Sequence, residues 1–421
     1  MELLTYLLHY VDRHVTDVRM KKEYLAKISH LQAYLYKANQ SWNVCYECCE
    51  RAVIAEIENA RLSILYHALK LQMECLEQGV CVENGALRRK QYLYLKEVVE
   101  EYKVVIDKFS MFTSEMSHGR SLVDEVIHYA RIRGAYTQEE FSEGICTPET
   151  LSRIETGKRT PTIKNFYALM EKSGMGISYY NTEFELERFE TMEKIANLRK
   201  LAALGKQEEA EALLKEVELE LDVSKNQQQI GIFHTVYDLR AGRITLEEAL
   251  EQTEQLAALS LKKADGRYLT PYQLTIVEFN ILNQIALYYD KLGKTGQAIE
   301  EIFLPLYEHL EARKVDRVEL GREYLMVTIN LAMFYEKLEE WQKALAMIEK
   351  TIATVLEEKW IAWLGYSLFI KYKIQRKLGQ AINLEQQKKA YFINMLGGDV
   401  ETAKDIRSYV WDNWRVALEE H

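Results

Sequence analysis

Residues 137–155 read TQEEFSEGICTPETLSRIE, and this stretch decides the fold of the middle of the chain. Thr137 is a favourable N-cap, and Glu140 three residues later completes the pattern of a capping box that starts a helix. We expect Gly144 to end that helix and Thr147 to cap a second one. The sequence therefore predicts two short helices joined by a tight turn.

Four apolar residues have the spacing needed to hold these two helices against each other: Phe141, Ile145, Leu151 and Ile154. Pro148 suits the first position of the second helix, where a missing N–H is harmless. A basic loop, Gly157-Lys158-Arg159, follows, and Thr162 starts a supporting helix that runs through Leu169. The pattern is typical of a helix-turn-helix with a third helix behind it.

The combination of Thr-Gln-Glu-Glu, Leu-Ser-Arg-Ile-Glu, Gly-Lys-Arg and the following Pro resembles the Cro/phage-repressor (XRE) type of helix-turn-helix, from Leu122 to Gly174. The turn Ser142–Cys146 is one residue shorter than the commonest form of that class. Its Gly-Ile-Cys sequence resembles the Rgg/PlcR (RRNPP) group, whose members join such a domain to tetratricopeptide-like repeats and respond to short signalling peptides. The resemblance implies a DNA-binding transcription regulator. We interpret Cys146 as a small apolar turn residue rather than a redox sensor.

In this type of motif the second helix enters the major groove with its N-terminal part toward the base edges. By position in the motif, the base-facing candidates are Thr147, Glu149, Thr150 and Arg153. Arg153 suits a bidentate contact to guanine, and Glu149 suits a cytosine amino group. The alternative role for Glu149 is to stabilise α-helix formation, because its negative charge would lie near the positive N-terminal end of the helix dipole.

Phosphate contacts are expected from Gln138, at the start of the first helix, and from Lys158 and Arg159. We expect Glu155 to be structural and to hold the loop at Gly157-Lys158. If the protein dimerises on double-stranded DNA, the operator should be symmetric, with half-sites one helical turn apart. Homodimerisation is what the resemblance implies.

A different regularity appears after residue 185. The spacing Leu-Gly-x4-Ala occurs at Leu204-Gly205 with Ala210 and at Leu292-Gly293 with Ala298, and a copy without the glycine ends at Ala344. Weaker versions surround Ala241-Gly242 and Leu378-Gly379. These pairs resemble tetratricopeptide hairpins, in which a small residue lets two helices approach closely, although the interval between the last two alanines exceeds the usual ~34 residues. The alternative is an irregular helical bundle.

A stack of such hairpins presents a concave face that suits an extended peptide. Placing Ala298 at the small-residue position puts Asn280 and Asn283 on the inner face, where an asparagine can bond both the N–H and the C=O of a peptide backbone. The family resembled commonly uses asparagines in this way. The equivalent positions of the other repeats are Gln229, Met326, Ile329 and Tyr366. Each of these six residues could instead be an ordinary surface or packing residue.

The chain as a whole is predicted to be all-α, since it has only four prolines in 421 residues and 48% hydrophobic residues. We divide it into an N-terminal helical domain (residues 1–116), a central five-helix-type helix-turn-helix DNA-binding domain (120–178) and a C-terminal tetratricopeptide-like α-solenoid (185–421). Gly397-Gly398 precedes a last helix, about Val400–Leu418, whose apolar residues would cap the stack. The N-terminal domain departs from the family, whose members usually begin with the DNA-binding domain.

The net charge of −10 is uneven, because residues 119–176 are neutral and the acidic excess lies mainly after them. A polyanion would therefore be tolerated only by the middle of the chain, and a ligand of the repeats should be neutral or basic. We see no membrane span, no signal peptide and no disulfide pattern among six cysteines, which favours a cytoplasmic protein.

Cys45-x-x-Cys48-Cys49 would place three thiols on one helix face, but no partner pair with zinc spacing follows. We predict no metal site, no cofactor and no enzyme activity, because no catalytic or phosphate-binding constellation is present. The leading interpretation is a DNA-binding regulator controlled by a peptide or small ligand in the repeat groove. The alternatives are a protein-interaction scaffold with a vestigial helix-turn-helix and a cysteine-based metal or redox sensor.

Overall fold

The computed structural model describes residues 2–14, 18–59, 61–106, 127–128, 130–132, 134–156, 158–159, 161–173, 191, 194–195, 197–198, 201, 206–221, 223, 226–264, 266–269, 274–312 and 317–418. In this part of the chain the fold is all-α apart from one two-stranded ribbon and short bridges, which confirms the predicted fold class. The described helices include none that is long and apolar enough to cross a membrane.

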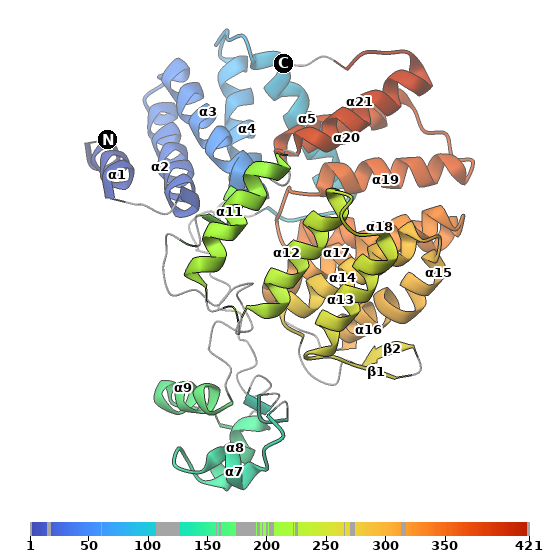
Figure 1. Cartoon of the computed structure of the whole chain (residues 1–421). Coiled ribbons are helices and arrows are strands. Elements are labelled where there is room, and N and C mark those ends of the chain that lie inside the picture. Colours follow the sequence, from blue (N-terminus) through green and yellow to red (C-terminus); the bar gives the residue numbers. More distant parts are fainter. Residues whose placement is uncertain are drawn as a thin grey trace. The chain divides into compact units, whose positions relative to one another are not determined.

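The chain packs as two compact units (Figure 1). The middle unit is His118–Leu338, and the terminal unit joins Met1–Ser117 to Glu339–His421. The first and last parts of the sequence thus belong to one body. The three-part division into residues 1–116, 120–178 and 185–421 stays a prediction.

The middle unit contains the predicted helix-turn-helix and the first repeats. Its helix-turn-helix comprises α7 (Gln138–Ser142), α8 (Pro148–Glu155) and α9 (Ile163–Lys172). The first and last residues of the predicted five-helix-type domain, 120–126 and 174–178, lie outside the described residues. The repeats comprise α11 (Gln207–Glu220), α12 (Gln227–Arg240), α13 (Leu246–Ala258), α14 (Ile276–Lys291), α15 (Thr295–Ala298), the π-helix η3 (Ile299–Phe303), α16 (Leu304–Ala312) and α17 (Arg317–Lys337). The ribbon of β1 (Lys262–Ala264) and β2 (Arg267–Leu269) follows α13.

The terminal unit is built from helices of both ends of the sequence. They are α1 (Glu2–His14), α2 (Val18–Ala38), α3 (Trp42–Asn59), α4 (Leu62–Glu77), α5 (Gly85–Glu101), α18 (Trp341–Glu357), α19 (Leu364–Lys377), α20 (Leu384–Leu396) and α21 (Val400–Trp414). The predicted last helix is confirmed as α21, where Ala403, Ile406 and Val410 are buried. Trp411, expected to cap the stack, is instead 50% exposed.

The repeat pattern marks real turns between packed helices. Ala210, Ala298 and Ala344 are all fully buried, as expected of the small residue at a close helix–helix approach. Gly293 has a φ of +76°, and Glu339, which replaces the glycine in the next copy, has a φ of +60°. Leu204-Gly205, the Leu-Gly pair of the first copy, lies outside the described residues. Antiparallel neighbours such as α12 with α13 and α19 with α20 confirm tetratricopeptide-like helical hairpins.

Polar contacts hold the two ends of the sequence together in the terminal unit. Lys371 of α19 is buried, and its Nζ lies 3.0 Å from carboxylate oxygens of both Glu101 and Glu349. The same Nζ donates to the hydroxyl of Tyr102 at 2.9 Å, and that hydroxyl donates to Glu349 at 2.6 Å. A buried ammonium requires such compensation. The N-terminal helices are therefore part of the same packed body as α18 and α19.

The cysteine cluster packs in the interior of the terminal unit. Cys45, Cys48, Cys49 and Cys75 are fully buried and unbridged. A hydrogen bond with Cys49, together with burial, raises the pKa of Cys45 to about 12. Burial also raises the pKa of Cys48. Buried thiols of high pKa are poor nucleophiles, and the described residues contain no group of three or more His, Cys, Asp or Glu side chains that could hold a metal ion.

Candidate nucleic-acid interface

The first helix of the motif begins as the sequence predicts. The Thr137 hydroxyl accepts from the Glu140 N–H at 3.2 Å, and the Glu140 carboxylate accepts from the Thr137 N–H at 2.8 Å. These two bonds satisfy N–H groups that have no partner inside the helix. The hydrogen bonds of Thr137 hold the pKa of the Glu140 carboxyl below its usual range. A capping box thus fixes where α7 starts.

The turn and the second helix also have the predicted geometry. Gly144 adopts a φ of +78°, a left-handed conformation that favours glycine. Thr147 caps α8 by accepting from the Thr150 N–H at 3.2 Å, and Pro148 occupies the first helical turn. At the end of α8, the N–H groups of Lys158 and Arg159 both donate to the carbonyl of Arg153. The basic loop is therefore tied to the helix that precedes it.

A small core locks the motif. Phe141, Leu151 and Ile154 are fully buried, and Ile145 and Cys146 pack against them while staying partly exposed. Burial raises the pKa of the Cys146 thiol, which agrees with a packing role. The remaining buried members of this core are Ile127, Ala130, Leu169 and Met170. The apolar contacts predicted across the turn are confirmed.

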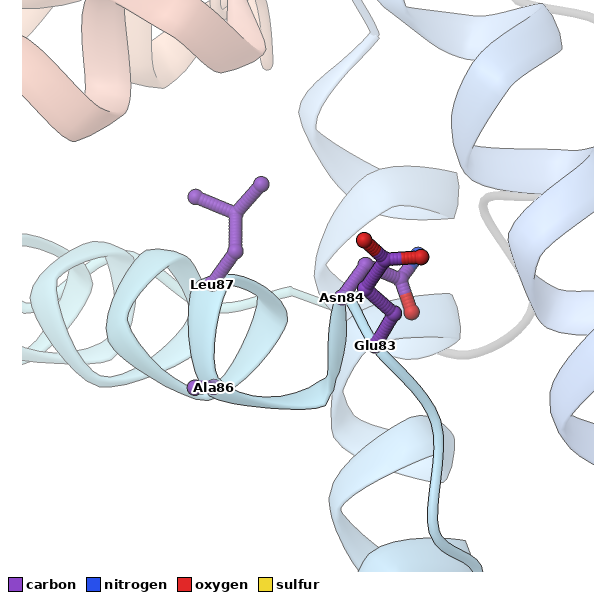
Figure 2. Close-up of a pocket in the computed structure, with 4 residues that line it drawn as sticks. All are labelled: Glu83, Asn84, Ala86 and Leu87. Atoms are coloured by element: carbon purple, nitrogen blue, oxygen red, sulfur yellow. The ribbon is translucent and has the colours of Figure 1, made fainter. Parts of the chain in front are cut away.

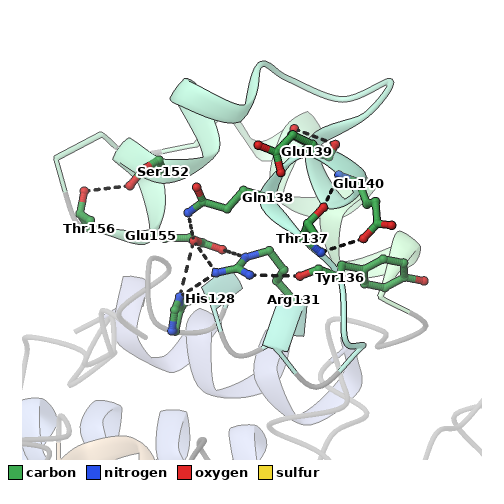
Figure 3. A network of polar contacts seen from close by, with 11 residues as sticks. His128, Arg131, Tyr136, Thr137, Gln138, Glu139, Glu140, Ser152, Glu155 and Thr156 are labelled. Atoms are coloured by element: carbon green, nitrogen blue, oxygen red, sulfur yellow. Dashed lines mark hydrogen bonds and ion pairs between the residues drawn. The ribbon is translucent and has the colours of Figure 1, made fainter.

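A buried carboxylate joins α7, α8 and the helical residue Arg131 (Figure 3). The Glu155 side chain is 3% exposed and accepts from Arg131 Nε at 2.6 Å and from Arg131 Nη2 at 3.0 Å. Gln138 Nε2 donates to the same carboxylate at 2.7 Å, and His128 Nδ1 lies 3.5 Å from it. We call these four residues the Glu155 clamp.

Burial acts to raise the pKa of Glu155, but the hydrogen bonds from Arg131 and Gln138 outweigh it. Together with the positive charges nearby, they hold this pKa below its ordinary value. The carboxylate is therefore ionised and paired at neutral pH, as a buried charge must be. In the described residues Glu155 contacts Arg131, Gln138 and His128 rather than the loop; Gly157 lies outside the described residues.

The face of α8 opposite this clamp is open to solvent. Thr147, Glu149 and Arg153 are exposed, Thr150 is partly exposed, and Lys158 and Arg159 are exposed in the loop. Arg159 Nη1 lies 3.4 Å from the Thr150 hydroxyl, which places the loop beside the base-facing candidates. All four candidates for base contacts and both loop candidates for phosphate contacts therefore belong to one accessible edge.

Gln138 is the DNA-binding candidate that takes part in the Glu155 clamp. Its amide N–H donates to Glu155, so the side chain is oriented before any DNA is present. Its predicted phosphate contact stays a prediction. Arg131 is the functional residue that sequence reasoning missed, because nothing local links it to Glu155, 24 residues later. A buried glutamate on a short helix is the signal that such a partner exists.

The candidates for peptide binding are distributed over both units. The middle unit contains five of them: Gln229 on α12, Asn280 and Asn283 on α14, and Met326 and Ile329 on α17. The sixth, Tyr366, lies on α19 of the terminal unit. Asn330 Nδ2 donates to Asn283 Oδ1 at 2.7 Å, so asparagines of successive repeats form a pair. Gln229 is 5% exposed and its Oε1 has no hydrogen-bond partner among the described residues. Ile329 is also 5% exposed.

A cavity of about 400 Å³ lies at the start of α5 in the terminal unit (Figure 2). It is lined by Glu83, Asn84, Ala86 and Leu87, and Asn84 Oδ1 accepts from the Tyr46 hydroxyl at 2.9 Å. These four residues come from one short stretch of the chain. Glu83 is the charged residue among them, so this lining contains no cluster of charged groups. We assign it no role.

Comparison with protein families finds one match: residues 127–179 match the family described as helix-turn-helix. These residues contain α7, α8, α9 and the Glu155 clamp. The predicted helix-turn-helix is thereby confirmed, and the match supports a DNA-binding regulator. Among curated proteins no match is found.

Solved structures that this chain resembles include PlcR and ComR. PlcR of Bacillus thuringiensis in complex with the peptide PapR7 and DNA is 20% identical, with a TM-score of 0.44 over 68% of this chain and 96% of that one. ComR of S. thermophilus with DNA and its signalling peptide ComS is 14% identical, with a TM-score of 0.38 over 68% and 98%. The apo competence regulator ComR of Streptococcus vestibularis is 11% identical, with a TM-score of 0.37 over 70% and 99%. At these values no ligand or partner follows for this chain.

Proposed function

We propose that this protein is a sequence-specific DNA-binding transcription regulator that reads operator DNA with the exposed edge of α8. One observation carries the proposal: Thr147, Glu149 and Arg153 are exposed at the side of a helix whose other side is fixed by a buried core and the Glu155 clamp. A rigid helix with exposed polar side chains on one edge can enter the major groove without reorganising.

Each exposed side chain has a chemical role in this proposal. Arg153 donates two of its guanidinium N–H groups to the O6 and N7 of a guanine, and Glu149 accepts from a cytosine amino group. Lys158 and Arg159 bind phosphates and set the register of the helix without reading sequence. Gln138, held by Glu155, adds a further phosphate contact from the start of α7.

The neutral charge of residues 119–176 makes the few exposed cations important. Because nonspecific affinity for DNA scales with the number of phosphates neutralised, a domain with this charge should bind nonspecific DNA weakly. Two copies on a symmetric operator would double the contacts. We therefore propose that the protein acts as a homodimer, with half-sites one helical turn apart.

A selection from randomised DNA duplexes at fixed salt tests the DNA-binding proposal. The full chain should enrich a symmetric consensus that includes a guanine in each half-site. The matched control is Glu139→Gln, on the exposed surface of α7 and outside the proposed edge. Enrichment of no sequence by the folded parent protein would contradict sequence-specific reading.

We further propose that a short peptide binds the repeats of the middle unit and controls DNA binding. The Asn283–Asn330 amide pair supports this, because a primary amide has several hydrogen-bonding positions and the contact between the two uses only one of each. Gln229 adds a buried acceptor in need of a donor. Unpaired buried acceptors are costly unless a ligand or water satisfies them.

A library of synthetic heptapeptides presented to the full chain tests peptide control. The parent should enrich a set of related peptides, and Asn283→Ala with Asn330→Ala should lose that set. Gln284→Ala, next to Asn283 on α14, is the control and should retain it. If the double variant enriches the same peptides as the parent, the amide pair does not bind them.

The second candidate function is a protein-interaction scaffold whose helix-turn-helix no longer reads DNA. The neutral charge of residues 119–176 is the observation that favours it. A scaffold would bind all duplexes weakly and alike, with a salt dependence that Arg153→Ala does not alter. A regulator would lose preference for particular base pairs in the same variant.

A further inference from the structure

A lysine lies among aromatic and acidic side chains beside the two-stranded ribbon of the middle unit. The Nζ of Lys263, on β1, lies 5.2 Å from the ring centroid of Tyr268 on β2 and 5.8 Å from that of Tyr289 on α14. It also lies 3.3 Å from a carboxylate oxygen of Glu254 on α13 and 3.5 Å from one of Glu301 on η3. We call Tyr268, Tyr289, Glu254 and Glu301 the ammonium cage.

The cage walls are fixed by contacts that do not involve Lys263. The Tyr289 hydroxyl donates to Glu254 Oε1 at 2.9 Å, and Gln297 Nε2 donates to Glu301 Oε1 at 2.9 Å. Tyr268 and Tyr289 are buried, with 6% and 3% of their surfaces exposed. Gly266 turns the ribbon with a φ of +79°, and a Cβ there would lie 3.2 Å from Glu301 Oε1. Tyr289, Glu254 and Glu301 therefore keep hydrogen-bond partners of their own if the lysine leaves.

Lys263 donates to the Tyr289 hydroxyl at 3.1 Å and is partly open to solvent. All three residues of β1 are exposed, and the Lys263 side chain is 34% exposed. A lysine side chain has a long flexible stem, so its ammonium can swing into water without movement of the strand. Ion pairs with this degree of exposure contribute little to stability. The cation of a ligand could therefore displace the Lys263 ammonium at a small cost in stability.

The vacated cage would demand a cation. Glu254 and Glu301 both approach the position of one ammonium, and two carboxylates so placed repel each other without it. The ring of Tyr268 and the hydroxyl oxygen of Tyr289, which accepts from Lys263 Nζ at 3.1 Å, add attraction for the same charge. The acidic excess of residues 177–421 raises the local concentration of cations further.

We propose that the ammonium cage binds the primary ammonium of a ligand, a lysine side chain or an amino terminus, and that Lys263 occupies it in the absence of that ligand. In this view Lys263 is an internal competitor. The proposal rests on the proposed peptide control only for the identity of the natural ligand. The cage itself can be tested with a small amine.

Saturation-transfer NMR with n-butylammonium and the full chain measures the cage directly. Lys263→Gln should bind the amine about tenfold more tightly than the parent, a factor worth ~1.4 kcal/mol, because the internal competitor is gone. Lys262→Gln, the neighbouring exposed residue on β1, is the matched control and should bind like the parent. n-Butanol, the neutral analogue, should bind none of the three proteins. Equal binding of the amine by Lys263→Gln and Lys262→Gln would overturn the proposal.

A second variant and a second ligand keep the outcomes distinct. Lys263→Met removes the same cation if Lys263→Gln fails to fold, and Glu254→Gln combined with Lys263→Gln should abolish the tighter binding. Among selected heptapeptides, acetylation of their amines should weaken binding if the cage is used. Peptides that bind regardless of acetylation would contradict the cage and leave peptide control standing. Amine binding by Lys263→Gln without any peptide binding would support the cage and contradict peptide control.

Discussion

Two buried glutamates, one in each compact unit, show opposite electrostatics. Glu155 in the helix-turn-helix has a guanidinium at 2.6 Å, and its pKa is held below the ordinary value. Glu56 in the terminal unit is fully buried and accepts from the Arg61 backbone N–H at 3.2 Å, and its Oε2 has no hydrogen-bond partner among the described residues. Burial raises the pKa of Glu56 to about 7.

The difference shows how the surroundings of Glu155 in the helix-turn-helix and of Glu56 on α3 decide the role of a buried acid. In the helix-turn-helix, an ionised carboxylate with several donors fixes two very short helices that have little apolar core of their own. In the terminal unit, long helices already supply a large core, and the acid is tolerated close to its neutral form. A paired charge gives a small domain its rigidity, whereas an unpaired one is a liability near neutral pH.

The largest effect should come from Glu155→Gln. Loss of the charge leaves the Arg131 guanidinium, 11% exposed, without its counter-ion, and breaking a buried pair in this way costs about 3 kcal/mol or more. Hydrogen exchange of peptides that cover α8 measures this, and their protection should fall strongly. Glu139→Gln, an exposed change on α7, should leave protection unchanged. Full protection of α8 in Glu155→Gln would mean that the clamp is dispensable.

Glu56→Gln should have the next largest effect, with the opposite sign. At pH 8 the parent carries an ionised Glu56 whose burial outweighs the nearby positive charges, so the neutral amide should stabilise the terminal unit by roughly 2 kcal/mol. All six tryptophans lie in that unit, so denaturation followed by tryptophan fluorescence reports on it. Glu47→Gln, an exposed change on the same helix, is the control. A less stable Glu56→Gln at pH 8 would show that the carboxylate has a stabilising partner.

The pH dependence should separate the two glutamates. Because the folded-state pKa of Glu155 is depressed, its contribution is complete above the ordinary glutamate pKa of about 4.3 and disappears as the pH falls through the lower, folded value. For Glu56 the folded pKa is raised, so stability is complete below about 4.3 and is lost as the pH rises to about 7.

Subtracting the stability of a variant from that of the parent at each pH isolates the contribution of one glutamate. Taking the difference also removes the contribution of His30, whose pKa burial lowers to about 4 and which acts in an overlapping window. The difference for Glu155→Gln, measured by exchange in α8, should shrink on acidification. At pH 8 the Glu56→Gln variant should be more stable than the parent, as measured by fluorescence. This gain in stability should also shrink as the pH falls. Two differences of the same sign at pH 8 would remove the contrast between the units.

The smallest effect concerns an exposed glutamate, where backbone conformation rather than charge decides. Glu339 has a φ of +60° at the position where the preceding repeat has Gly293. A left-handed conformation costs a non-glycine residue roughly 1 kcal/mol, so Glu339→Gly should stabilise the chain by about that amount. Glu340→Gly, one residue on, should destabilise it instead. Thermal denaturation of both variants measures the effect, and a loss of stability in Glu339→Gly would contradict it.

The sequence predicts local features of the fold well because their causes are local. The capping box at Thr137, the glycine turn at Gly144 and the cap at Thr147 each depend on residues within a few positions. Buried alanines in the repeats were predictable for the same reason, because a fixed spacing reveals them. These elements place the proposed DNA-binding edge without any knowledge of the rest of the molecule.

Contacts between distant residues were not predictable. Arg131 reaches Glu155 across 24 residues, and Lys371 reaches Glu101 across 270. No periodicity links such pairs, since they depend on how whole helices pack. For this reason the sequence gives no sign that residues 1–117 pack in one compact unit with residues 339–421. The ammonium cage around Lys263 was not predictable either, because its four residues come from four different elements.

The central claim is that the exposed edge of α8, with Arg153 at its centre, reads base pairs. The most direct test is the affinity of Arg153→Ala and Lys158→Ala for the duplex selected by the parent and for single base-pair variants of it. Arg153→Ala should lose about tenfold or more for the selected duplex and lose its preference at one base pair, whereas Lys158→Ala should weaken all duplexes alike. An Arg153→Ala protein that binds as tightly and as selectively as the parent would contradict the account.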